Sequence, residues 1–309
     1  MIKLVKHKGM GREMRQDDTP SELAIPTWTL AKDALKAGKA EESIRWIDYG
    51  ALEDKILINT ITKMSSMAML YIDDNFGNEA LNKFWGQSDL PMPKVKENSD
   101  WRNPAPALDL AKKAATAGRT DESAWWIDYL AMEDRIVHDA VTRMCDSALT
   151  YLADNYGEEQ VEKFWRWTYP PSHIKQMLSE LPSPKELFLR QAEYARAHQC
   201  DFTMSEEPDR YVRTNKICGS GCRMRRAGKC GVTKKPYPWS WGKKGIPYYC
   251  VHCSIFEEIV PIEVRGYPLR IQELGEKPED PCIIYYYKKP ELIPEQYFTR
   301  VGKVKPGKR

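Results

Sequence analysis

The chain has 309 residues, a length that allows two or three domains with separate hydrophobic cores. Its 42% hydrophobic and 29% charged residues argue against general disorder, and no stretch approaches the ~18 consecutive apolar residues of a membrane span. The net charge of +3 conceals an asymmetry: acids outnumber bases in residues 26–168, whereas residues 210–256 hold eleven Lys or Arg and no Asp or Glu.

The first residues are basic and lack the apolar stretch of an export signal. We therefore expect residues 1–21 to be a flexible tail and the protein to be cytoplasmic. In that compartment the eight cysteines would stay reduced. A second basic tail is expected at residues 301–309.

An internal duplication follows. A shift of 80 residues aligns residues 26–85 with residues 106–165, and 28 of these 60 positions are identical. The motif Trp-Ile-Asp-Tyr begins at Trp46 in the first copy and at Trp126 in the second. Identity at this level indicates two repeats of one structural unit.

Each repeat is predicted to form a short helix, a glycine turn, a long helix, a glycine stop and another short helix. Gly38 and Gly118 mark the turns, and apolar residues recur at three- and four-residue spacing in between. The long segment covers some 35 residues, about 50 Å if helical throughout, so we expect a kink or two helices. Residues 22–170 would then form one all-α bundle, which offers a surface for a protein partner.

Within the second repeat, Asp134 and His138 lie four residues apart on one helical face, as metal ligands on helices often do. The alternative interpretation is that the repeated acids form a solvated face and the aromatic residues form the core. The first repeat has Ile58 at the position of His138, so the pair is not duplicated.

Pro-rich segments at residues 87–106 and 169–184 are predicted linkers. Residues 171–199 would hold a linker and a helix. Residues 200–300 would form a small cysteine-rich α+β domain with an antiparallel sheet: a hairpin at 201–213, a helix at 254–264, and strands at 267–274 and from Cys282. The predicted fold class is α+β, with an all-α tandem-repeat bundle preceding this domain.

The strongest chemical signal is a group of cysteines in the last third. Cys250-x-x-Cys253 can chelate one ion from a single turn, and a second group can supply further thiolates. The candidate metal ligands are Cys218, Cys222, Cys230, Cys250, Cys253 and Cys282. Zinc suits a closed thiolate site, and an iron–sulfur cluster is the alternative. Cys145 and Cys200 stand apart and are expected to be small buried apolar residues.

Between the cysteines runs a basic, aromatic stretch that has three interpretations. It could bind a small anion, such as a carboxylate or a coenzyme A thioester, through Arg223, Arg225 or Arg226. It could bind nucleic acid, with Trp239 and Trp241 stacking on bases. It could also dock onto the acidic repeats or onto a partner protein.

The last third also resembles a known superfamily. The resemblance rests on Cys222-Arg-Met, Pro247-Tyr-Tyr-Cys250, Gln272-Glu-Leu-Gly and Asp280-Pro-Cys282, and it covers roughly residues 200–290. The superfamily includes the L-2-amino-thiazoline-4-carboxylic acid hydrolase-like and 4-vinyl-reductase-like domains. It implies hydrolysis of small carboxylated heterocycles, or binding of small molecules in aromatic-sensing regulators.

Some members hold zinc through cysteines and a glutamate, which nominates Cys250, Glu273 and Cys282 here. This sequence departs from that pattern: the spacing from Glu273 to Cys282 is shorter and an intermediate cysteine is missing, so Cys253 could take that place. The helical repeats have no counterpart in the resemblance and remain unassigned.

These observations lead to three functional hypotheses. The first is a metal-binding metabolic enzyme or enzyme subunit that binds a small anionic ligand, with hydrolysis suggested by the resemblance alone. The second is a non-catalytic assembly module with structural zinc. The third is a nucleic-acid-binding protein that uses the basic aromatic stretch.

Overall fold

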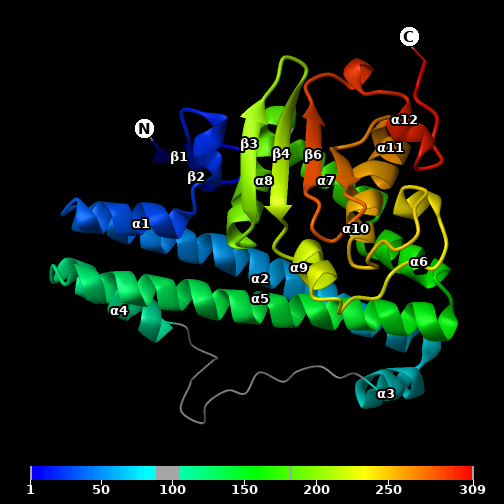
Figure 1. The fold of residues 1–309 in the computed structure, drawn as a ribbon, viewed down its shortest axis with the longest axis horizontal. Helices are drawn as coiled ribbons and strands as arrows, with labels where there is room; N and C mark the ends of the chain where they lie inside the picture. Colours follow the sequence, from blue (N-terminus) through cyan, green and yellow to red (C-terminus); the bar gives the residue numbers. More distant parts are fainter. Residues whose placement is uncertain (1, 88–104, 181–182, 308–309) are drawn as a thin grey trace.

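The computed structural model describes residues 2–87, 105–180 and 183–307. Two long helices lie side by side along the molecule, and a small sheet with several short helices packs on one side of them (Figure 1). This arrangement confirms the predicted α+β fold with a helical N-terminal region.

Both repeats have the predicted order of helices. The first contains α1 (Thr27–Lys36), α2 (Ala40–Phe76) and α3 (Asn78–Gln87). The second contains α4 (Ala105–Thr116), α5 (Thr120–Tyr156) and α6 (Glu159–Thr168). The turns before α2 and α5 place Gly38 and Gly118 at φ values of +73° and +71°, where a side chain would be strained.

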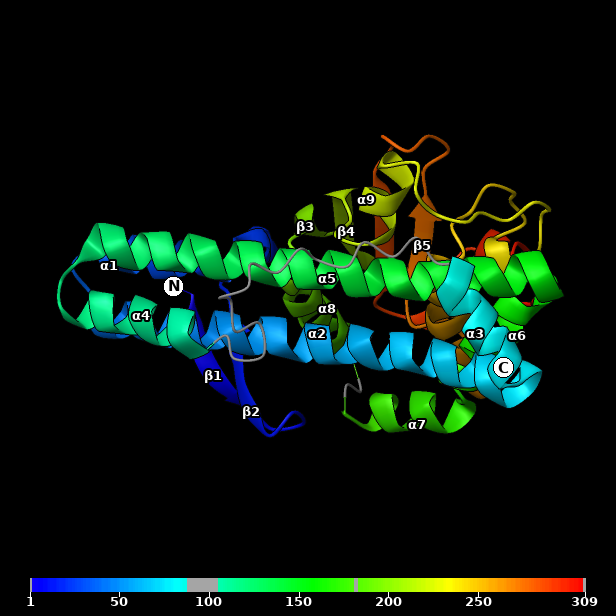
Figure 2. The ribbon, with the colours of Figure 1, turned by 90° about the horizontal axis from the view of Figure 1, so that it is seen from below.

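The expected kink in the long segments is wrong. α2 and α5 are continuous helices of 37 residues each, about 55 Å long at 1.5 Å per residue. Neither contains proline, and the one glycine inside α2, Gly50, is used for packing: a Cβ there would lie 3.0 Å from the ring of Trp28. The two helices are neighbours along their length, and α1 and α4 pack alongside them at one end (Figure 2).

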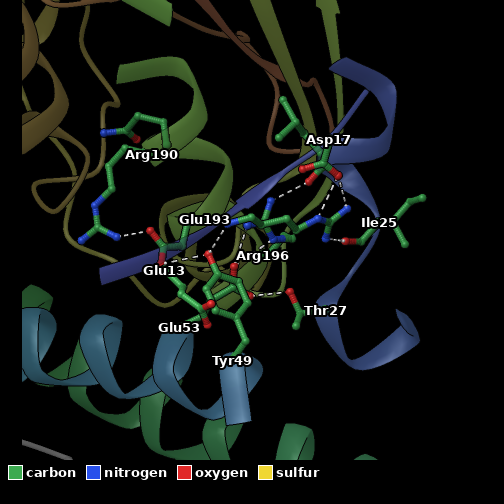
Figure 3. A network of polar contacts seen from close by, with 12 residues as sticks. Glu13, Asp17, Ile25, Thr27, Tyr49, Glu53, Arg190, Glu193 and Arg196 are labelled. Atoms are coloured by element: carbon green, nitrogen blue, oxygen red, sulfur yellow. Dashed lines mark hydrogen bonds and ion pairs between the residues drawn. The ribbon is translucent and has the colours of Figure 1, made fainter. Parts of the chain in front are cut away.

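The N-terminal segment is also different from the expectation. Residues 1–21 were expected to be a flexible tail, but β1 (Lys3–His7) and β2 (Arg12–Gln16) form an antiparallel hairpin, followed by the 3-10 helix η1 (Pro20–Ala24). Buried polar contacts explain why this segment is folded against the rest of the protein. Arg15 pairs with Asp17 and donates to the carbonyl of Ile25, within a network that reaches α2 and α8 (Pro184–Ala197) (Figure 3).

The last third begins after α7 (Pro171–Glu180) and α8, whose first turn is capped by Ser183. Its sheet has the order β3-β4-β6-β5, with every neighbouring pair antiparallel, as predicted. The strands are β3 (Asp201–Glu206), β4 (Arg210–Ile217), β5 (Ile271–Leu274) and β6 (Cys282–Tyr287).

Short helices connect these strands. They are α9 (Gly221–Arg226), α10 (Val251–Ser254), the π-helix η3 (Ile255–Ile259) and α11 (Val260–Arg265), with α12 (Gln296–Thr299) after the sheet. The predicted helix at 254–264 corresponds to η3 and α11.

The boundary expected near residues 171–199 does not divide the hydrophobic core. One continuous cluster of buried residues runs from α2, α5 and α6 into the sheet and the helices around it. Trp165 of α6 is fully buried in it and donates its indole N–H to the carbonyl of Tyr248, at 3.2 Å. The second repeat and the cysteine-rich part therefore share one core, although they were expected to be separate domains.

Candidate functional site

A cavity of about 440 Å³ lies between the sheet and the helices α2, α7, α8 and α10. Its floor is the sheet, because alternate residues of a strand point to the same face. Residues 213 and 215 of β4, 282 and 284 of β6, and 272 and 274 of β5 all line it. The volume of about 440 Å³ is typical of a small-molecule site.

Cysteines converge on one wall of this cavity. Five of the six predicted metal ligands line it, and Cys200 joins them. The lining cysteines are Cys200, Cys218, Cys222, Cys250, Cys253 and Cys282. The group at the cavity differs from the group in the sequence: Cys230 does not line the cavity, whereas Cys200, which stands apart in the sequence, does.

The local fold brings these sulfurs together from four segments. Cys250 immediately precedes α10 and Cys253 lies within it. Cys282 begins β6, where it pairs in register with Asn215 of β4. Gly221 opens α9 next to Cys222, and any Cβ at Gly221 would collide with Sγ of Cys250. Glycine is thus required here for the close approach of two cysteine-bearing segments.

The thiols differ in acidity. Burial raises the pKa of Cys250 and Cys282, and raises that of Cys253 to about 12. Cys218 is the exception, because hydrogen bonds from Cys200 and Cys222 lower its pKa well below the ordinary value. The cavity wall therefore favours one thiolate, with other thiols beside it that need a further positive charge to ionise.

Arg213 supplies such a charge. It is buried on β4 and donates one Nη–H to the carbonyl of Gln191, at 2.8 Å, while its Nε has no hydrogen-bond partner. No carboxylate among the described residues forms an ion pair with it. Its charge acts on the thiols of Cys253 and Cys282, where it opposes in part the burial that raises their pKa values. A buried cation without an anion is costly, so this position favours a negatively charged occupant nearby.

Other polar groups face the same space. Asn215 is buried with its Oδ1 unpartnered. Arg270 forms a buried ion pair with Glu257, at 3.0 Å, and lies 3.7 Å from Sγ of Cys253. Glu257 keeps Oε2 unpartnered, and Arg270 keeps Nε unpartnered. Unsatisfied buried groups of this kind are rare in folded proteins, and their gathering at one cavity indicates a polar ligand.

Three histidines also line the cavity, His173, His198 and His252, and the sequence pattern did not single them out. His198 donates from Nδ1 to the carbonyl of Tyr194 at 2.7 Å, and His252 donates from Nδ1 to the carbonyl of Tyr249 at 2.6 Å. This leaves Nε2 as the lone-pair nitrogen of each ring. Burial lowers the pKa of His198 to about 3, so its ring is neutral.

Beside polar residues such as Lys63, Glu180 and Arg190, the helices contribute an apolar wall to the cavity. Most of it comes from α2, α7, α8 and η3, and its methionines are flexible. The residues are Met10, Leu57, Ile61, Met64, Met67, Tyr169, Met177, Leu187 and Phe256. A ligand that fills the cavity would therefore have an anionic or polar end at the sheet and an apolar body toward the long helices.

The arginines predicted to bind the anion have other partners. Arg223 forms an ion pair with Asp139 and donates to the carbonyl of His198. Arg225 and Arg226 donate to carbonyls of the 275–279 loop. None of the three lines the cavity. They attach α9 to its neighbours because backbone carbonyls that lack secondary-structure partners need donors.

Trp239 and Trp241, the predicted stacking residues, are buried. Trp239 stacks on Tyr237 with ring centroids 4.3 Å apart, and the indole N–H of Trp241 donates to Glu258 at 3.0 Å. Neither lines the cavity, and neither ring is free to stack on a base. The basic stretch is tied to the acidic second repeat, through Lys234 to Asp154 for example, at 2.7 Å.

The contacts of two further candidate metal sites, Glu273 and the Asp134–His138 pair, show how their side chains are used. Glu273 accepts hydrogen bonds from Tyr285 and Tyr297 and does not line the cavity. Asp134 is hydrogen-bonded to Asp54, whereas His138 contacts Asp139, so Asp134 and His138 do not form a pair. Within residues 2–87, 105–180 and 183–307, no three His, Cys, Asp or Glu lie close enough together to hold a single metal ion.

The described helices include none that is both long and apolar enough to cross a membrane. No family model, no curated protein and no solved structure matches this chain.

Proposed function

We propose that the cysteine-lined cavity holds a thiolate-ligated metal centre, and that the protein is a metabolic enzyme or enzyme subunit that binds a small carboxylate beside it. The observation that carries this proposal is the buried guanidinium of Arg213, which faces several thiols and has no carboxylate partner among the described residues. Thiolates and a ligand carboxylate are the anions that would compensate it.

An iron–sulfur cluster suits the arrangement of cysteines better than one zinc ion. Four ligands of one zinc ion must all lie about 2.3 Å from it, whereas the cysteines here come from separate segments around a cavity of about 440 Å³. In a [4Fe–4S] cluster each cysteine would bind a different iron, so the sulfurs would surround a wider space. Cys218, Cys222, Cys250, Cys253 and Cys282 would supply the ligands, and the cluster would supply redox or Lewis-acid chemistry.

The chain's own residues would position the ligand. Arg213 and the amide of Asn215 present hydrogen-bonding groups on the sheet floor, and Arg270 adds a second guanidinium. The apolar wall, which includes Met64 and Phe256, would pack on the ligand body and exclude water, which strengthens the charged contacts. A volume of about 440 Å³ favours a small carboxylate over a whole coenzyme A thioester.

The metal part is tested on protein purified without oxygen, by iron, zinc and sulfide analysis and an absorption spectrum. We expect iron with acid-labile sulfide, lost in Cys250→Ser and Cys282→Ser. Cys230→Ser is the matched control and should keep the metal, because Cys230 lies outside the cavity. Stoichiometric zinc without sulfide would replace the cluster by a zinc site, and protein free of both metals would refute the proposal.

The ligand part is tested by thermal shift against a panel of small aromatic and aliphatic carboxylates. A carboxylate at one hundred times its Kd should stabilise the protein by about 2.7 kcal/mol. Arg213→Met should abolish this stabilisation. Arg225→Met, a change at an arginine bound to backbone carbonyls, should leave it intact. Equal loss in both variants would contradict the assignment.

A further inference from the structure

The duplication provides a comparison inside the molecule. On α2, Tyr49, Glu53 and Leu57 form a face that is buried. The N-terminal hairpin, η1 and α8 cover it: the backbone N–H of Arg15 donates to the Tyr49 hydroxyl at 3.1 Å, and Arg196 pairs with Glu53 at 2.6 Å (Figure 3). The first repeat thus uses this face for packing.

The equivalent face of α5 is less covered: Tyr129 and Glu133 are partly buried and Val137 is exposed. Val137, which corresponds to Leu57, is 45% exposed, whereas Leu57 is 2% exposed. Next to it Trp125, Met132 and Ile136 are 57%, 50% and 52% exposed. No described element covers these three side chains. A group of large apolar residues at the surface is uncommon in monomers and indicates an interaction site.

The spacing of the apolar residues along α5 favours a second copy of this helix as the partner. Trp125, Tyr129, Met132 and Ile136 follow one another at intervals of four, three and four residues, the spacing of a coiled-coil seam. These intervals read the same in both directions. A second α5 that runs antiparallel would therefore place Trp125 against Ile136 of the second copy, and Tyr129 against Met132 of the second copy. Such a two-fold contact is self-complementary.

The charges beside the seam agree with this pairing. Asp128 and Arg135 lie on the same edge of the seam, seven residues apart and of opposite sign. In the antiparallel arrangement Asp128 lies beside Arg135 of the second copy, and the reverse contact forms as well. Asp128 is exposed in the single chain and also contacts Lys32 at 2.6 Å.

We propose that the protein forms a two-fold dimer through this face of α5, with the seam of Trp125, Tyr129, Met132 and Ile136 at its centre. The second copy would cover the exposed side of α5 that begins at Tyr129, the counterpart of the buried Tyr49. The inference goes beyond the cavity and does not depend on its ligand, because none of these four residues lines it.

The test measures the mass of the full chain by analytical ultracentrifugation over a wide range of concentrations. We expect a dimer for the unaltered chain. Ile136→Glu should raise the dimer Kd by about 100-fold or more, because two symmetric sites would bury unpaired carboxylates. Leu70→Glu is the matched control: Leu70 is 55% exposed on α2, outside the seam, and its replacement should leave the dimer intact.

A charge exchange tests the register. Arg135→Asp should weaken the dimer, and the double variant Asp128→Arg with Arg135→Asp should restore it. Helicity by circular dichroism should be equal in all variants, since these residues are at the surface. A monomer at every concentration overturns the proposal, as does a dimer that Ile136→Glu leaves unchanged. A double variant that dimerises no better than Arg135→Asp overturns the antiparallel register.

Discussion

Asp54 and Asp134, which occupy the same position in the two repeats, are hydrogen-bonded to each other across the interface of α2 and α5. Both are buried or nearly so, and Trp28 donates its indole N–H to Asp54 at 3.2 Å. Two carboxyls in contact cannot both be ionised at low cost, so the pair holds a proton. Duplication has thus placed an acid pair in the middle of the bundle.

This pair predicts a pH dependence of stability. Burial and the neighbouring charge raise the pKa of Asp54, and burial raises that of Asp134. A raised carboxyl pKa means that the folded state binds more protons, so the stability from the pair is complete below about pH 4 and is lost as the pH rises. Asp54→Asn should flatten the fall in unfolding free energy above pH 4, measured by urea titration. Asp109→Asn, a change at an exposed residue, should leave this pH dependence unaltered. An equal effect of the two substitutions would contradict a proton shared between Asp54 and Asp134.

Asp146 predicts a second pH effect at a different place. This buried carboxylate of α5 accepts the backbone N–H of Gly231 at 3.2 Å, and burial raises its pKa to about 7. Stability should therefore decline between about pH 4 and pH 7 as the carboxyl ionises in the fold. Asp146→Asn keeps an acceptor oxygen without the charge and should raise the melting temperature at pH 8 more than at pH 5. A gain that is the same at both pH values would contradict this.

The two repeats supply matched controls for buried ion pairs. Glu53 is paired with Arg196 and accepts from Thr27 at 2.6 Å (Figure 3). Removal of one partner of such a buried pair leaves the other charge uncompensated and costs about 3–5 kcal/mol. Glu53→Ala should show this loss in urea denaturation. Glu133→Ala, the same change in the second repeat at a less buried position, should stay within about 0.5 kcal/mol. Comparable losses would contradict the difference between the two faces.

The shared core makes a prediction about cooperativity. Trp165 is fully buried between the second repeat and the cysteine-rich part, whereas Trp85, its equivalent in the first repeat, is 47% exposed. Trp165→Ala should lower the free energy of unfolding by about 3–5 kcal/mol. In calorimetry it should lower the melting temperature of the helices and of the sheet by the same amount. Trp85→Ala should cost much less. Two separate transitions, with only one displaced by Trp165→Ala, would mean that the parts unfold independently.

The sequence by itself determined the helices of the two repeats, the order of the strands in the last third and the concentration of cysteines there. Helical periodicity, glycine stops and internal identity are local or repeated signals, so they can be read without the fold. The continuity of the long helices was within reach as well, since α2 and α5 contain no proline.

Only the tertiary structure decided which side chains face one cavity. Cys230 lies in the cysteine group of the sequence and Cys200 stands apart from it, yet Cys200 lines the cavity and Cys230 does not. Arg213 lines the cavity and Arg223 does not, since the strand register directs Arg213 to the sheet floor. Whether a charged side chain is buried without an oppositely charged partner depends on packing among distant segments, and no local sequence pattern encodes it.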